Sequence, residues 1–302
     1  MRVGLLVRHN LENTTWIVLA CCWSALLLPN TVCAGEATSA GDLYELKYQF
    51  HPDQPLRSRV VHLVTTETRI RGVTQESKSR SNSVRVWRVL GTDPDGRVQF
   101  EHVVESVDMW QKVTGRPEVS YNSLTDKHPP PEYELAAESV GATISIVTVD
   151  QFGEVYARKD FKPIPNFGLG QITTPLPRGK VPVGHQWEFP TEIALYLPDG
   201  RVKRVKTRQL YTLESVKTGV ATISVKTQVL TPVNDPRIQI QLMQQLANGI
   251  IKFDIDEGRI LFRQIDWDET VIGFHGPDSC VKYLARYVEE YLPDESPVAQ
   301  AR

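Results

Sequence analysis

Two stretches of the chain repeat each other, and each has the pattern of a strand, a tight turn and a return strand. They are Ile144-Ser-Ile-Val-Thr-Val-Asp-Gln-Phe-Gly-Glu-Val-Tyr156 and Ile251-Lys-Phe-Asp-Ile-Asp-Glu-Gly-Arg-Ile-Leu-Phe262. In both, apolar and polar residues alternate up to an Asp, and a Gly shortly afterwards can supply the positive φ that a tight reversal needs. The repeat predicts that one β-rich unit occurs twice in the chain.

The rest of the chain shows the same alternation. Ile223, Val225 and Val229 alternate with polar residues, which is typical of a strand with one buried face. Turn residues separate such runs, with Pro94-Asp95-Gly96 and Pro198-Asp199-Gly200 as the clearest pair. We therefore expect a mainly β protein made of antiparallel meanders.

The repeat divides the chain into two predicted units, residues 41–160 and residues 191–292. Each is expected to curl into a half-barrel and to carry one short helix, Pro131–Val140 in the first unit and Ile240–Ala247 in the second. Residues 161–190 between them hold six prolines and four glycines, which favours an extended linker.

The end of the chain has a different pattern. Asp278 or Ser279 can cap a helix that runs to Leu292, and Pro293 ends it. The apolar stripe of this amphipathic helix comprises Val281, Leu284, Ala285, Val288 and Leu292. A stripe of this width predicts that the helix lies on the second sheet, and residues 293–302 are left as a tail.

Residues 1–34 have the features of an export signal. Arg2 and Arg8 precede an apolar stretch of 13 residues, Trp16–Leu28, and Val32-Cys33-Ala34 offers small residues for cleavage after Ala34. A membrane-spanning helix needs roughly 20 apolar residues. We expect export to the periplasm or the cell exterior, with no integral membrane span after cleavage. An uncleaved anchor and a lipoprotein signal ending at Cys21 stay open as alternatives.

Loss of this segment changes the charge of the chain little. The formal net charge is −2, and it becomes −3 without Arg2, Arg8 and Glu12. A chain with this balance has no general attraction for nucleic acid. Three of the four cysteines also leave, so Cys280 has no partner for an intramolecular disulfide. Stability has to come from packing.

Short motifs of common catalytic and cofactor sites are missing from the sequence, so we predict no catalytic, cofactor-binding or metal-binding residue and no cofactor. This favours a non-catalytic protein without excluding an enzyme. The best acidic cluster is Asp266, Asp268 and Glu269, with His275 nearby. It leaves a hydrolase-type site in the Asp266–His275 region as an alternative.

Basic residues concentrate in two stretches. The first holds Arg57, Arg59, Arg69, Arg71, Lys78, Arg80, Arg85 and Arg88, and the second holds Arg201, Lys203, Arg204, Lys206 and Arg208. Such stretches fit a surface for an anionic envelope polymer or a lipid head group. They also fit a solvated sheet face whose charges pair across strands, and this is the interpretation that we favour.

Cysteine and tryptophan are two further residue types that could have a functional role. Cys280 would lie in the first turn of the predicted C-terminal helix, where the helix dipole makes a thiol more reactive, but a buried structural cysteine is the interpretation that we favour. The tryptophans Trp87, Trp110, Trp187 and Trp267 are spread evenly over both units. This spread predicts core positions rather than a shared stacking surface.

One segment resembles a known family. Val181-Pro-Val-Gly184-His-Gln-Trp187, followed by an Asp-Gly turn and the hairpin at Ile251–Phe262, is similar to an uncharacterised family of exported bacterial two-repeat β proteins. The resemblance covers Val181 to about Thr270 and, more weakly, Leu43 to Lys159. It implies a compartment and an architecture, and it carries over no activity and no site residue.

These observations lead to one main functional hypothesis. We expect an exported, non-catalytic binding or scaffolding protein of the bacterial envelope, with an apolar or lipid-like ligand or an envelope component as its partner. The alternatives are the hydrolase and a purely structural envelope protein. The sequence does not indicate the oligomeric state.

Overall fold

The computed structural model describes residues 41–162, 173–197 and 200–293. In chain order the elements are β1 (Leu43–Glu45), β2 (Leu56–Ile70), β3 (Val73–Thr92), β4 (Val98–Val113), β5 (Val119–Asn122), η1 (Pro131–Tyr133), α1 (Glu134–Ala137), β6 (Thr143–Val149), β7 (Val155–Asp160), β8 (Lys180–Pro182), β9 (Gln186–Tyr196), β10 (Val202–Lys217), β11 (Val220–Val229), α2 (Pro236–Leu242), η2 (Met243–Gln245), β12 (Asn248–Asp254), β13 (Arg259–Ile272) and β14 (Cys280–Leu292). Within these ranges, no helix has both the length and the apolar character needed to span a bilayer.

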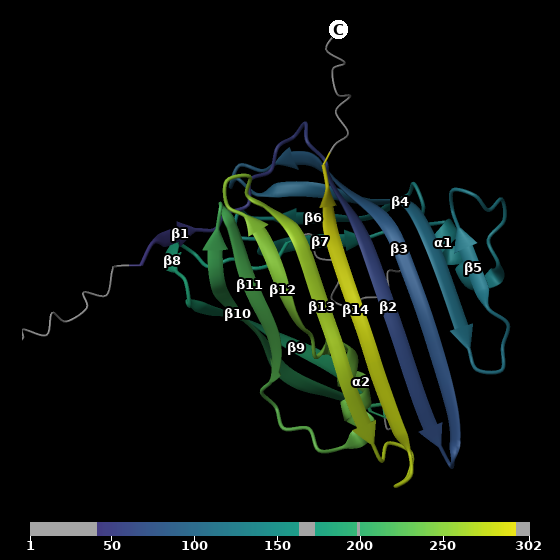
Figure 1. Cartoon of the computed structure of the whole chain (residues 1–302). Helices are drawn as coiled ribbons and strands as arrows, with labels where there is room; N and C mark the ends of the chain where they lie inside the picture. Colours follow the sequence, from purple (N-terminus) through teal and green to yellow (C-terminus); the bar gives the residue numbers. More distant parts are fainter. Residues whose placement is uncertain (1–40, 163–172, 198–199, 294–302) are drawn as a thin grey trace, which may run out of the picture. The chain divides into compact units, whose positions relative to one another are not determined.

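Most strands of the described part belong to one antiparallel sheet of twelve strands (Figure 1). Its main path runs β7-β6-β4-β3-β2-β14-β13-β12-β11-β10-β9, and β5 pairs with β4 beside this path. β1 and β8 form a separate two-stranded sheet. The large sheet curls, so that β6 and β7 pass behind β13 and β14 in Figure 1. The prediction of a mainly β, antiparallel protein is confirmed.

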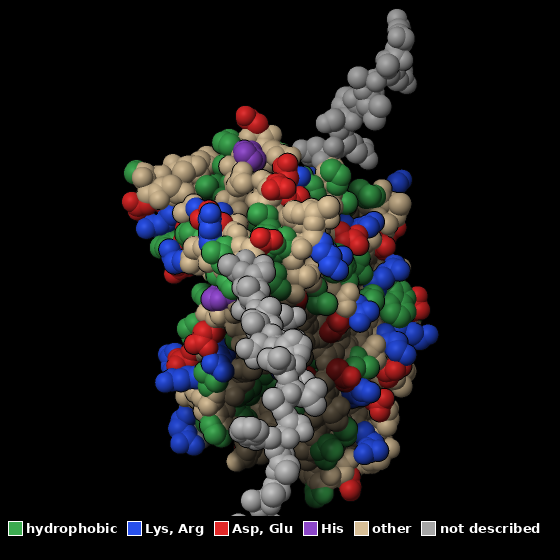
Figure 2. All heavy atoms as spheres, turned by 60° about the vertical axis from the view of Figure 1, so that its left-hand side comes forward, with side chains coloured by type: hydrophobic (Ala, Val, Ile, Leu, Met, Phe, Trp, Pro, Cys, Tyr) green, Lys and Arg blue, Asp and Glu red, His purple; other side chains and the backbone are tan. Residues whose placement is uncertain are grey.

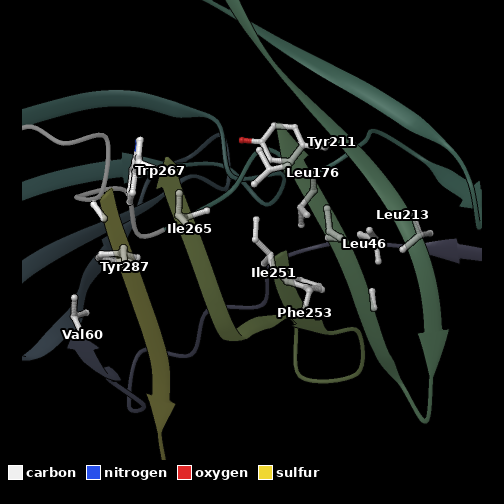
Figure 3. Packing of buried hydrophobic residues seen from close by; sticks show 14 of the residues in the cluster. Leu46, Val60, Leu176, Tyr211, Leu213, Ile251, Phe253, Ile265, Trp267 and Tyr287 are labelled. Carbon is white, nitrogen blue, oxygen red and sulfur yellow. The ribbon is translucent and has the colours of Figure 1, made fainter. Parts of the chain in front are cut away.

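One face of the large sheet, here called the core face, carries the main hydrophobic core (Figure 3). Leu213, Ile223 and Phe253 on β10, β11 and β12 are completely buried, because every second residue of each strand points to this side. Leu46, from the segment before β2, is also completely buried in the same cluster. The opposite face of the sheet is called the outer face below.

The predicted C-terminal helix is wrong, because Cys280–Leu292 is strand β14. β14 pairs with β13 on one side and with β2 on the other. Val281, Tyr283 and Tyr287 alternate onto the core face and are buried. Leu284 and Val288, half-buried on the outer face, complete an apolar stripe that also fits a helical period. Because these apolar residues fit both a helical and a strand period, the period alone does not distinguish a helix from a strand. Pairing with β13 and β2 makes this segment a strand.

The pairing of β14 with β2 joins the two predicted units. Residues 41–160 and 191–292 both contribute strands to the same sheet, and β2 and β14 meet along thirteen paired positions. Each unit has three long strands, a short helical segment and a hairpin in the same chain order. This order fits the proposed duplication, which stays a prediction.

The two short helices lie close to their predicted places. In the first unit, η1 and α1 span residues 131–137, and Gly141 follows with a positive φ of 75°. In the second unit, α2 begins at Pro236, earlier than predicted, because Asp235 caps it by accepting a hydrogen bond from the backbone N–H of Arg237.

The predicted linker contains regular structure. β8 (Lys180–Pro182) pairs with β1, and β9 begins at Gln186, inside the range 161–190 that was predicted to be an extended linker. Pro190 is tolerated because β9 is an edge strand of the sheet. Residues 163–172 of the linker, the predicted signal segment 1–34, most of the tail and the turn residues 198–199 lie outside the described residues.

The two repeated hairpins turn as predicted. Asp150 and Asp254 each accept hydrogen bonds from two backbone N–H groups of their own turn, and Gly153 and Gly258 have positive φ. The segment before β2 contacts both turns: the N–H of Tyr48 donates to Gln151 O at 2.8 Å, and the N–H of Gln49 donates to Gly258 O at 2.9 Å. This segment therefore links the hairpins of the two units at one end of the sheet.

Candidate functional site

An open hollow of about 800 Å³ crosses the outer face in the middle of β4, β3, β2, β14 and β13. Two rows of side chains border it, and each row consists of cross-strand neighbours. The first row is Trp110, Arg80, Leu63, Arg286 and Asp266, and the second is Lys78, Thr65, Leu284 and Asp268. The hollow thus depends on the register of five strands.

The floor of the hollow comes from the residues between the two rows. Ser79, Val64, Ala285 and Trp267 lie between them in their strands and also line the hollow. Their side chains point to the core face, where Ala285 and Trp267 are buried. Their backbone is therefore what the hollow exposes, and it is paired with neighbours on both sides.

Charge changes sign along the hollow. Lys78 and Arg80 on β3 make one end basic, and Asp266 and Asp268 on β13 make the other end acidic. Between them lie the apolar side chains of Leu63, which is 43% exposed, and Leu284. Arg286 on β14 also lies there, and its guanidinium is paired with Asp266. A sheet surface with charged groups of opposite sign on its two outer strands and apolar groups between them can recognise a ligand by its charge arrangement as well as by its apolar part.

Most charges at the hollow already have partners. Arg80 Nη2 donates to Asp108 Oδ2 at 3.2 Å, and Arg286 Nε donates to Asp266 Oδ1 at 2.6 Å. This hydrogen bond raises the pKa of Arg286. These pairs are about half-exposed and screened by solvent, so each contributes little to stability and can be exchanged for a ligand contact at low cost.

Asp268 differs from the other charges of the hollow. Among the described residues, no hydrogen-bond donor or basic side chain is paired with its carboxylate, and the residue is exposed. Leu284 is its cross-strand neighbour on β14. An unpaired carboxylate beside an apolar side chain suits a basic group that also brings apolar carbon atoms.

The predicted acidic cluster does not converge. Asp266 and Asp268 lie on the outer face, whereas Glu269 points to the core face, where burial and then the charge of Asp268 raise its pKa. His275 lies beyond the end of β13, which is roughly 20 Å of strand from Asp266, and its backbone N–H donates to Ser279 Oγ. Within the described residues, no three His, Cys, Asp or Glu side chains are placed to hold a metal ion.

In the described part of the chain, six of the thirteen residues in the two basic stretches have an acidic partner on another strand: Arg57, Arg59, Arg80, Arg88, Arg204 and Arg208. Arg57 contacts Glu105 at 2.7 Å, and Arg204 and Arg208 contact glutamates on β9 at 2.8 and 2.6 Å. Basic and acidic side chains are interspersed over the face seen in Figure 2. This is the pairing that we favoured from the sequence. Only Lys78 and Arg80 of the first stretch line the hollow.

Sequence reasoning missed the role of Trp110. Trp87 and Trp267 are 4% exposed, as expected of core residues, but Trp110 is half-buried on the outer face and borders the hollow. Its neighbours at two positions on either side, Asp108 and Lys112, are polar. This parity places Trp110 on the solvent side of its strand and was the available signal.

Two histidines on the core face are held neutral. Burial lowers the pKa of His62 to about 4 and that of His102 to about 3, and the nearby charge of Arg85 adds to both shifts. His102 stacks on Trp87 with 4.1 Å between the ring centroids. His62 lies edge-on to Trp267 and Tyr287. Neutral histidines in such ring contacts support packing and are poor proton carriers near pH 7.

Cys280 is half-buried and is the first residue of β14. The helix dipole that could have made its thiol more reactive is not present, because a strand and not a helix begins there.

Searches against protein-family models and curated proteins find no match to this chain. The resemblance to the uncharacterised exported family therefore stays a prediction.

Proposed function

We propose that this protein is an exported, non-catalytic binding or scaffolding protein of the bacterial envelope, and that the hollow on the outer face is its binding site. The observation that carries the proposal is the hollow itself. Its volume of about 800 Å³ lies within the range of ligand sites, and it combines apolar surface with a few charged groups. Within the described residues, no three His, Cys, Asp or Glu side chains are placed to hold a metal ion, and the lining of the hollow includes no histidine or cysteine.

The chemistry of the hollow favours an amphipathic ligand over a purely apolar one. On β10–β12 the core face is filled by completely buried residues such as Leu213, Ile223 and Phe253. A second hollow, near Tyr48 and Trp87, measures only about 30 Å³, which is room for a water molecule or two. The core face therefore supports the lipid-carrier version less well than the outer face supports a charged, partly apolar partner.

The export part of the proposal rests on the sequence of residues 1–34 and on the loss of three of the four cysteines with that segment.

A purely structural envelope protein is the second candidate. The observation that favours it is the large number of cross-strand ion pairs, such as Arg59–Glu290 and Arg208–Glu188, which fit a plain solvated sheet surface.

Fluorine NMR of the protein labelled with 5-fluorotryptophan separates these two candidates. Residues 35–302 contain four tryptophans, and the Trp110→Phe variant assigns the signal of Trp110. We expect small amphipathic molecules from a fragment library to shift the Trp110 signal and to leave Trp187, at the far edge of the sheet, unchanged. A library that never shifts Trp110, or shifts both signals alike, would contradict a binding site at the hollow.

A further inference from the structure

We infer that the hollow holds an extended peptide segment that lies across the strands, with an acidic side chain at β3 and a basic side chain at β13. This inference rests on the proposed function and specifies its ligand. It follows from three features of the hollow: the order of its charges, the distance between its two charged ends, and the nature of its floor.

The order of the charges sets the direction of the ligand. The ammonium of Lys78 lies 2.8 Å from Glu76 and the guanidinium of Arg80 lies 3.2 Å from Asp108, and all four side chains are about half-exposed. A ligand carboxylate can share these two basic groups or replace their present partners. At the other end, Asp268 has no paired basic group among the described residues and can receive an ammonium or a guanidinium. A ligand with a single charge would satisfy only one end and would meet like charge at the other.

The distance between the ends selects the kind of ligand. β3 and β13 are separated by three strand spacings, through β2 and β14, which amounts to about 14 Å. A zwitterionic lipid head group or a single amino acid carries its charges only a few bonds apart and cannot reach both ends. An extended peptide rises about 3.3 Å per residue, so side chains four positions apart match the span.

The middle of the hollow fits the residues between those two charges. Leu63 and Leu284 are cross-strand diagonal neighbours that offer apolar surface, and Thr65 offers a hydroxyl beside both. Arg286, opposite Leu63, is held by its pair with Asp266. Trp110 lies beyond Arg80 and extends the surface at the basic end. We expect small or medium apolar side chains between the acidic and the basic residue of the peptide.

The floor of the hollow determines which groups of the protein can recognise the peptide. β2, β14 and β3 are interior strands whose backbone groups are already paired on both sides. The peptide therefore cannot add a strand to the sheet here, and recognition has to come from side chains. We expect modest affinity and a strong dependence on charge and ionic strength, as for other contacts between half-exposed charges.

A set of four blocked pentapeptides tests the inference. They are Glu-Leu-Thr-Leu-Lys, Glu-Leu-Thr-Leu-Glu, Lys-Leu-Thr-Leu-Lys and Gln-Leu-Thr-Leu-Gln, each titrated against the fluorotryptophan-labelled protein. We expect the mixed-charge peptide to shift the Trp110 signal and to bind roughly tenfold more tightly than the neutral one. The Asp268→Lys variant should instead prefer the peptide with two glutamates. Asp278→Lys makes the same charge change on an exposed loop outside the hollow and should keep the native preference.

The outcomes separate this inference from the function on which it rests. If all four peptides shift Trp110 equally, or if Asp268→Lys leaves the preference unchanged, the charge-ordered peptide site is wrong while binding at the hollow stands. If no peptide shifts Trp110 but library fragments do, the ligand is not a peptide of this kind. If neither peptides nor fragments shift Trp110, both the inference and the proposed function are contradicted.

Discussion

The two faces of β2, β14 and β13 differ in the role of their side chains, which pack the core on one face and form a charged surface on the other. On the core face, Tyr287 is 1% exposed and packs between Ile265 and His62. On the outer face, one residue away, Arg286 lies half-exposed between Leu63 and Asp266. The same strands thus hold the fold together with one set of side chains and present a charge-ordered surface with the other. Substitutions should separate the two roles.

The largest effect is expected on the core face. Phe253 is completely buried, and its ring lies edge-on to Tyr48 with 5.2 Å between centroids. Phe253→Ala should lower the free energy of unfolding by about 3–5 kcal/mol, because it removes apolar contacts and leaves a cavity. Urea denaturation measures this. Leu63→Ala on the outer face is the matched control and should cost well under about 1 kcal/mol. Equal losses would contradict the division between the faces.

A smaller effect is expected at the hairpin turn that contacts the segment before β2. Gly258 has a φ of 60°, and a methyl group added there would approach the backbone nitrogen of Gln49 to 2.5 Å. Gly258→Ala should therefore cost more than the 1–2 kcal/mol of a positive φ alone. Gly96→Ala has a similar φ of 78° but open space around it, so it should show only that backbone cost. Thermal or urea unfolding of the two variants gives the comparison.

The pH dependence of stability tests the buried histidines of the core face. Burial lowers the pKa of His102 from 6.5 to about 3, so below pH 6.5 the unfolded chain binds a proton that the folded chain does not. The contribution of His102 is complete above pH 6.5 and is lost as the pH falls toward 3, by about 2 kcal/mol at pH 5.

The His102→Phe variant should show a flatter decline of the unfolding free energy between pH 7 and pH 5. It should also fold well at pH 7, because neither ring nitrogen of His102 has a hydrogen-bond partner in the described structure. Substitution of His128, exposed in the loop after β5, by Gln should leave the slope as it is. An unchanged slope in His102→Phe would show that other groups cause the acid sensitivity.

The smallest effect on stability is expected at the outer face. Asp266→Asn weakens the 2.6 Å contact with Arg286, but both side chains are half-exposed, so the unfolding free energy should fall far less than in Phe253→Ala. Binding of the mixed-charge peptide should fall several-fold in the same variant. A loss of several kcal/mol in unfolding would mean that Asp266 supports the fold rather than the site.

The sequence predicted the features that depend on neighbouring residues. Three such features depend only on residues close together in the chain, and the structure contains all of them. They are the Asp and Gly of each repeated hairpin, the alternation in β10–β12 and the helix end before Gly141. The C-terminal strand was misassigned because Leu284 and Val288, on its outer face, complete a helical stripe together with Val281 and Ala285 on its core face. Pairing with β13 and with β2, the latter more than 200 positions away in the chain, decides between the two.

The hollow could not be predicted for the same reason. Its residues come from two separate parts of the chain, residues 63–110 and 266–286, and only the pairing of β2 with β14 brings them together. The sequence singled out Lys78, Arg80, Asp266 and Asp268, but as members of separate basic and acidic stretches. A one-residue change in register would place Leu63 and Arg286 on the opposite face.

The most direct test of the central claim is to fill the hollow without touching the core. Thr65→Trp places a large side chain in the second row, at the middle of the hollow, and Thr222→Trp places one elsewhere on the outer face. Titration of the Glu-Leu-Thr-Leu-Lys peptide, with urea denaturation in parallel, should show that Thr65→Trp loses binding while its unfolding midpoint stays near that of Thr222→Trp. Native-like binding by Thr65→Trp would contradict the assignment of the hollow as the site.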